Sequence, residues 1–160
     1  MKNARPPRIA PALLFAAFLV VGCGGDGRVP LFPANGSVQV DGKPAAGVVV
    51  RLVPADALDD RDALQPFATT GDDGTFALGT YDKGDGAPAG RYKVTLFQPD
   101  RPPGPSHPND LLGGQYADAQ RSGLEVVIAE GPNTLKPFEA KGTPVAPQQS
   151  PVSHDPDFPE

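Results

Sequence analysis

The sequence predicts an all-β fold in which seven short strands form a two-sheet antiparallel sandwich. Three observations support this prediction. Short runs alternate apolar and polar residues, so that every second side chain can face a core. Gly, Asp, Asn and Pro residues separate these runs at intervals typical of sandwiches and barrels. No window of the sequence shows convincing helical periodicity.

The first two expected strands, residues 36–40 and 48–53, lie on either side of a turn. The dipeptide Asp41–Gly42 is a strong hairpin signal, and Pro44 prolongs the turn into a loop. The second strand is the richest β-branched run of the chain, a composition that favours strands. Alternation places the following residues toward the core: Val38, Val40, Val48, Val50 and Leu52.

Three further strands are expected at residues 67–70, 75–78 and 91–97. Residues 71–74, with the sequence Gly-Asp-Asp-Gly, turn the first of them into the second, and a long loop rich in Gly and Asp covers residues 81–90. The expected inward-facing residues are Phe76, Leu78, Tyr92, Val94 and Leu96.

The last two expected strands, residues 124–129 and 134–140, follow a segment that cannot be regular. Residues 99–108 contain five prolines, which remove too many backbone donors for a helix or a strand. Leu124, Val126 and Ile128 alternate toward the core. Pro137 requires that the final strand lie at an edge or contain a bulge.

Composition divides the chain into four parts. Residues 1–22 are expected to be an export segment, 23–34 a flexible tether, 35–140 the sandwich, and 141–160 a disordered tail rich in Pro, Gln, Ser and acidic residues. Formal net charge is -5, and the chain without its export segment has 11 basic and 19 acidic residues. Such a surface repels phosphate backbones, so nucleic acid is not expected as a partner.

The N-terminus has the pattern of a bacterial lipoprotein signal peptide. A basic start with Lys2 and Arg8 precedes an apolar run at residues 9–21, which is too short for a comfortable membrane span. Residues 19–23, Leu-Val-Val-Gly-Cys, resemble the lipobox. This resemblance implies attachment of a diacylglyceryl group to the Cys23 sulfur, cleavage after Gly22, and acylation of the new amino terminus, with palmitate among the acyl chains.

Cys23 is the only cysteine of the chain, so it cannot form an intramolecular disulfide. Each buried methylene adds roughly 0.8 kcal/mol of membrane affinity, and more than one acyl chain makes attachment stable. We therefore expect an exported, lipid-anchored membrane protein. No Asp occupies the second position after cleavage, which in enteric bacteria favours the outer over the inner membrane.

Three stretches resemble the carboxypeptidase regulatory-like domain. Residues 36–48 are similar to its opening strand, turn and second strand, residues 73–76 to a later turn, and residues 84–94 to the approach to a long strand. The likeness covers about residues 35–140 and is closest to small bacterial lipoproteins with one such domain. It implies a transthyretin/Ig-like seven-stranded sandwich that is non-catalytic and serves as a binding or structural module, without a cofactor.

Two other functions follow from particular residues. A carbohydrate-binding module of the same fold would need exposed aromatic side chains, for which Tyr81 and Tyr116 are the candidates. A calcium-binding adhesion domain would need clustered carboxylates, because hard oxygen ligands suit Ca²⁺. The carboxylate candidates are Asp72, Asp73, Asp82 and Asp85, with a second group at Asp56, Asp59, Asp60 and Asp62. Asp is also a common turn residue, and we favour that interpretation.

An enzyme is not expected. His107 and His154 are the only histidines, and Ser106 beside His107 gives no convergent dyad, because sequence neighbours seldom point at each other. The hydrolase branch of the transthyretin-like fold, which acts on 5-hydroxyisourate, has a histidine-bearing N-terminal strand and a Tyr-Arg-Gly-Ser ending. This chain has neither.

Overall fold

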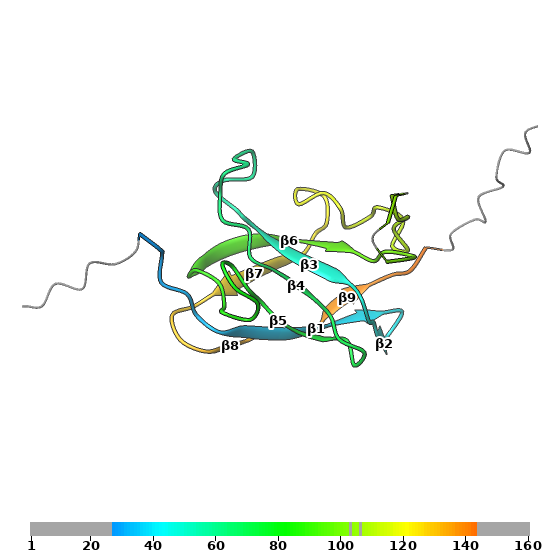
Figure 1. Ribbon diagram of the computed structural model, residues 1–160, viewed down its shortest axis with the longest axis horizontal. Helices are drawn as coiled ribbons and strands as arrows, with labels where there is room; N and C mark the ends of the chain where they lie inside the picture. The colour runs from blue at the N-terminus through cyan, green and yellow to red at the C-terminus, as the bar shows by residue number, and fades with distance from the viewer. Residues whose placement is uncertain (1–26, 103, 106, 144–160) are drawn as a thin grey trace, which may run out of the picture.

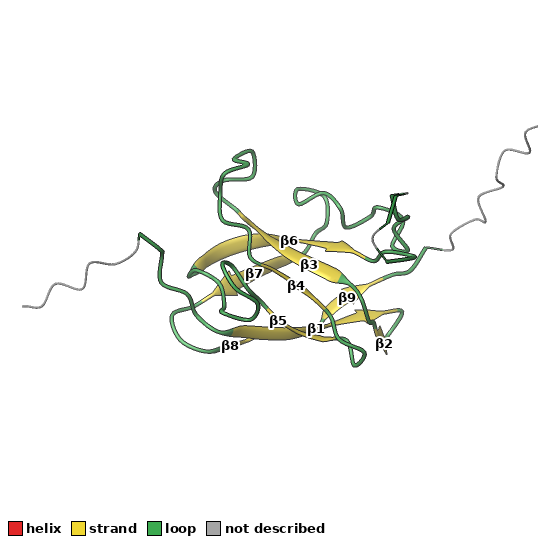
Figure 2. Cartoon of the chain, viewed as in Figure 1, coloured by secondary structure: helices red, strands yellow, loops and turns green. Residues whose placement is uncertain are grey.

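The computed structural model describes residues 27–102, 104–105 and 107–143, and these residues form an all-β fold (Figures 1 and 2). The export segment and residues 144–160 of the expected tail therefore lie outside the described residues, whereas residues 141–143 are described. The strands are β1 (Ala34–Val40), β2 (Lys43–Pro44), β3 (Val49–Pro54), β4 (Phe67–Thr69), β5 (Thr75–Ala77), β6 (Gly90–Phe97), β7 (Glu125–Ile128), β8 (Asn133–Thr134) and β9 (Phe138–Ala140). Within the described part of the chain, no helix has the length and apolar character that a membrane crossing requires.

Two sheets make up the sandwich, as the sequence predicts. The four-stranded sheet has the order β4-β3-β6-β7, and all its neighbouring strands are antiparallel. In the five-stranded sheet, β1 is central: β5 and β2 pair with it antiparallel on one side, while β8 and β9 pair on the other. The described chain enters the sandwich at one end and leaves it at the opposite end (Figure 1).

The expected final strand differs from the structure in two respects. The sequence predicts one strand over residues 134–140, but Pro137 has no N–H to donate and the segment forms β8 and β9 on either side of it. The prediction of antiparallel pairing is wrong here, because both strands run parallel to β1. After β7 the chain crosses from one sheet to the other and then follows the direction of β1.

The core lies between the two sheets and contains the side chains that alternation predicts. Those that are completely inaccessible to solvent include Val38, Val48, Val50, Leu52, Leu78, Val94 and Leu96. Burial of each such aliphatic side chain contributes about 1.5–3 kcal/mol. Val40 and Val126 are only partly buried and pack against the edge of this cluster.

Gly36 makes room for an aromatic contact in the core. A Cβ at this position would lie 2.6 Å from Cζ of Phe76. Phe76 on β5 stacks against Phe138 on β9, with ring centroids 6.0 Å apart and ring planes 7° from parallel. The missing side chain in the middle of β1 thus allows two rings from strands on its opposite sides to meet.

Candidate functional site

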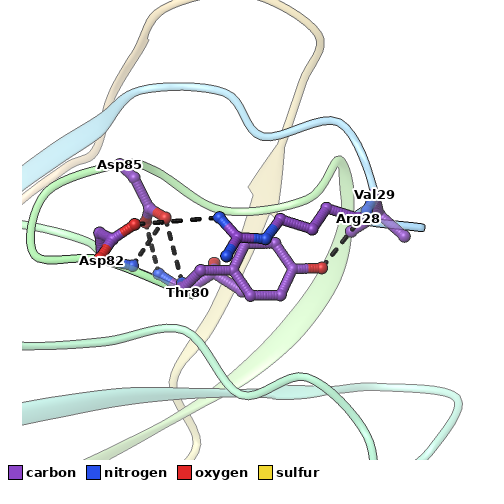
Figure 3. Close-up of polar contacts among 6 residues, drawn as sticks. Arg28, Val29, Thr80, Asp82 and Asp85 are labelled. Carbon is purple, nitrogen blue, oxygen red and sulfur yellow. Dashed lines mark hydrogen bonds and ion pairs between the residues drawn. The ribbon is translucent and has the colours of Figure 1, made fainter. Parts of the chain in front are cut away.

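A network of polar contacts shapes the Tyr81 loop, which we define as residues 79–87 between β5 and β6. The carboxylate of Asp85 organises it from within (Figure 3). Its Oδ1 accepts the N–H of Thr80 (2.7 Å), and its Oδ2 accepts the N–H groups of Tyr81 (3.1 Å) and Asp82 (2.8 Å). Partial desolvation alone would raise the pKa of Asp85, but these donors outweigh it and lower the pKa below its ordinary value.

The chain that enters the sandwich packs against this loop. The Tyr81 hydroxyl accepts the N–H of Val29 (3.3 Å), and the guanidinium carbon of Arg28 lies 4.9 Å from the centroid of the Tyr81 ring (Figure 3). Arg28 also forms an ion pair with Asp82, with Nη1 4.0 Å from Oδ2. The aromatic candidate Tyr81 therefore holds the N-terminal segment through both its ring and its hydroxyl.

A groove of about 380 Å³ lies beside this contact and includes another aromatic side chain. Phe67, at the start of β4, is 55% exposed and pairs through its backbone with Gly79. The groove is lined by Phe67, Thr69, Gly79, Thr80, Tyr81, Asp82 and Lys83. Aromatic faces next to hydroxyl, carboxylate and ammonium groups are suited to contact with a polar molecule.

The structure does not bring the acidic candidates together. Asp72 and Asp73 lie in the β4–β5 turn, whereas Asp82 and Asp85 lie in the loop beyond β5. Among the described residues, no group of three or more Asp, Glu, His or Cys side chains is arranged so that it could hold a metal ion. The backbone and hydroxyl of Thr75 donate to Asp73 and lower its pKa.

The acidic loop after β3 serves a turn in the same way. Oδ1 of Asp60 accepts the N–H of Asp62 at 2.9 Å. Together with Asp73 and Asp85, this contact shows aspartates used as local backbone acceptors, which agrees with the turn interpretation of these positions.

The other candidates are dispersed. Tyr116 is partly buried against the core, and its hydroxyl accepts the N–H of Lys141 (3.1 Å), so it secures the chain after β9. His107 is exposed in the proline-rich loop. The remaining named positions lie outside the described residues: Gly22, Cys23, Ser106 and His154.

The proline-rich loop is tied together by Asp100. Its carboxylate accepts hydrogen bonds from the guanidinium of Arg101 (3.0 Å) and from the backbone and side chain of Asn109 (3.0 and 2.9 Å). The Arg101 and Asn109 hydrogen bonds lower the pKa of Asp100 from 3.8 to about 2. The charged carboxylate therefore reinforces a closure that the backbone also makes, through the Pro99–Asp110 bridge and the hydrogen bond from the N–H of Asp100 to the carbonyl of Asn109 (3.0 Å).

Lowering the pH toward 2 is expected to open this loop at Asp100. Because the folded pKa lies below the ordinary value, the stabilisation is fully present above about pH 4 and is lost as the pH falls through about 2. The amide signal of Asn109, followed by NMR, should report this transition. An Asp100→Asn variant should not show it, and a midpoint near 4 in the native chain would contradict the pairing.

Two residues that contact the Tyr81 loop or line its groove, Arg28 and Phe67, were not among the sequence candidates. Arg28 falls in the stretch that composition predicts to be a flexible tether. Phe67 precedes Ala68 and Thr69, and since Ala68 is buried in the sheet, strict alternation would have placed the Phe67 ring outward. That signal was present in the sequence.

Comparisons with known proteins leave the family of the chain open. The chain matches no family model and no curated protein. Among solved structures, it is similar to a DUF3823 family protein from Parabacteroides merdae, with 18% sequence identity and a TM-score of 0.39. The similarity covers 72% of this chain and 48% of that one, so the chain spans about half the length of the structure that it matches.

Proposed function

We propose that this protein is a lipid-anchored component of the bacterial cell envelope whose β-sandwich is a non-catalytic binding or structural module of the carboxypeptidase regulatory-like type. The observation that carries the proposal is the single cysteine at the end of a basic and apolar leader, preceded by Leu-Val-Val-Gly. Acyl chains on Cys23 would hold the sandwich at a membrane surface.

The arrangement of the described residues supports a role without catalysis. Asp82 is paired with Arg28, and Asp85 accepts three backbone N–H groups, so both carboxylates of the Tyr81 loop serve its structure. These structural roles of the two carboxylates support the proposal of a non-catalytic module.

A Cys23→Ser substitution is expected to abolish acylation of the protein. Wild-type protein expressed with a radioactive or clickable palmitate should carry the label and partition into the detergent phase. Because the chain has no other cysteine, the variant should carry no thioether-linked lipid. The same variant behind an ordinary secretory leader should partition into the aqueous phase. An intact mass showing an unmodified Cys23 thiol in the wild-type protein would refute the proposal.

A carbohydrate-binding role is a second candidate, favoured by one observation. The half-exposed Phe67 ring and Tyr81 line the same groove, with the hydroxyls of Thr69 and Thr80 beside them. An exposed ring next to polar groups is suited to a sugar face. Binding of soluble glycans by the lipid-free protein would distinguish this role from a purely structural one.

A further inference from the structure

The residues just before β1 are part of the fold rather than a free tether. We define residues 28–33 as the N-terminal segment. Phe32 and Ala87 exchange two backbone hydrogen bonds, of 2.9 and 3.0 Å, and Phe32 packs against the core. Arg28 and Val29 contact Asp82 and Tyr81 as described above (Figure 3). The ordered part of the chain therefore begins earlier than the boundary at residue 35 that composition predicts.

Gly86 shows that the Tyr81 loop is shaped to receive this segment. Its φ angle is +105°, and a Cβ at this position would lie 2.3 Å from the carbonyl oxygen of Phe32. The nearby Gly84 also has a positive φ, +77°, but a Cβ there would meet only the side chain of Ala77, at 3.9 Å. Of these two glycines, only Gly86 is required for the close approach of the N-terminal segment.

The docking leaves a short connection to the proposed lipid. Five residue steps separate Cys23 from Arg28, and fully extended chain covers at most about 3.6 Å per residue, or about 18 Å in all. The eight residues of β6 alone span about 26 Å. The connection is thus shorter than the sandwich, so the domain cannot turn end over end without release of the N-terminal segment.

We infer that the end of the sandwich formed by the N-terminal segment, the Tyr81 loop and residues 129–132 faces the lipid bilayer. Residues 129–132 belong to this end because the N–H of Asn133 donates to the carbonyl of Pro33. The β1–β2 and β4–β5 turns lie at the other end of the sandwich (Figure 1). In the inferred orientation these turns face away from the membrane. This inference rests on the proposed lipid attachment at Cys23.

Chain length, and not charge, selects this orientation. The membrane-facing end bears the acidic side chains of Asp82, Asp85 and Glu130, which anionic lipid headgroups would repel. The Arg28 guanidinium is directed to the Tyr81 ring and to Asp82. The bilayer therefore lies against this end because the acylated cysteine is only a few residues away.

A matched pair of labelled variants tests the orientation in lipidated protein. Because Cys23 is acylated in the proposal, Glu130→Cys and Asp72→Cys each introduce one reactive thiol, at exposed positions near opposite ends of the sandwich. Each variant receives the same fluorophore and is reconstituted into phosphatidylcholine vesicles containing a headgroup nitroxide quencher. We expect quenching at position 130 to be at least threefold stronger than at position 72. Equal quenching, or stronger quenching at 72, would overturn the inference.

A second matched pair tests the docking itself. Gly86→Ala should raise amide hydrogen exchange at Val29 and Phe32 by tenfold or more and reduce the difference in quenching between the two labels. Gly84→Ala, which also places an alanine at a positive φ but makes no clash with Phe32, should preserve both. Unchanged exchange in Gly86→Ala would contradict the docking.

The two proposals fail in different ways. If wild-type protein does not float with the vesicles, both the proposed lipid anchor and the orientation that depends on it are refuted. If the protein floats but the labels at positions 130 and 72 are quenched equally, the lipid anchor is supported and only the orientation is refuted.

Discussion

Replacing Phe76 by alanine is expected to destabilise the sandwich by about 3–5 kcal/mol, the usual cost of removing a buried phenylalanine. The Phe76 ring is almost completely buried and stacks on Phe138 across the gap left by Gly36. Its removal would leave a cavity between β5 and β9, and the rigid β1 backbone beneath cannot move to fill it. Urea unfolding of the lipid-free protein, followed by circular dichroism, measures the loss.

Phe67→Ala is the matched control for this substitution. It removes the same ring from the same protein, but the Phe67 side chain is 55% exposed. Its effect on stability should be within about 0.5 kcal/mol, as for most surface substitutions. Similar losses of unfolding free energy for the two variants would show that burial of the Phe76 ring against Phe138 does not stabilise the sandwich as we expect.

The alternation of side chains was sufficient to predict the central strands and their buried faces. Val48, Val50 and Leu52 occupy every second position of a β-branched run, and all three are inaccessible to solvent. A period of two fixes which face of a strand is apolar, and this is a local property of the sequence. The all-β class and the two sheets follow from the same pattern.

The pairing partners of the last strands were not predictable in this way. Alternation says nothing about which strand lies alongside, and Pro137 indicated an edge or a bulge without indicating its neighbour. β8 and β9 lie parallel to β1 because the chain changes sheets after β7. That crossover depends on tertiary packing, for which the local sequence has no separate signal.

The candidate site was predicted only in part, because its residues act through distant partners. Tyr81, Asp82 and Asp85 were candidates on residue type alone. The structure uses Asp85 to shape its own loop and Tyr81 to hold Val29, which is 52 residues away in the sequence. The glycine- and proline-rich composition before β1 predicts flexibility, but backbone pairing with Ala87 overrides it.

Gly74→Ala is expected to destabilise the protein by about 2–5 kcal/mol through strain and a steric clash together. Gly74 has a φ of +74°, which costs an L-residue about 1–2 kcal/mol. A Cβ there would also lie 2.9 Å from both the backbone N of Ala45 and the carbonyl oxygen of Val38. These two atoms are hydrogen bonded to each other at 3.0 Å, so the methyl group would force apart the contact that closes this end of β1.

Gly42→Ala separates the strain from the clash. Gly42 has almost the same φ, +75°, but a Cβ there would have no atom within 4 Å. It follows Asp41, whose φ of 51° completes the hairpin turn that the Asp-Gly dipeptide predicts. We therefore expect only the strain of about 1–2 kcal/mol for Gly42→Ala. The difference between the two unfolding free energies measures the clash, and equal losses would show that the β4–β5 turn can withdraw from β1 without cost.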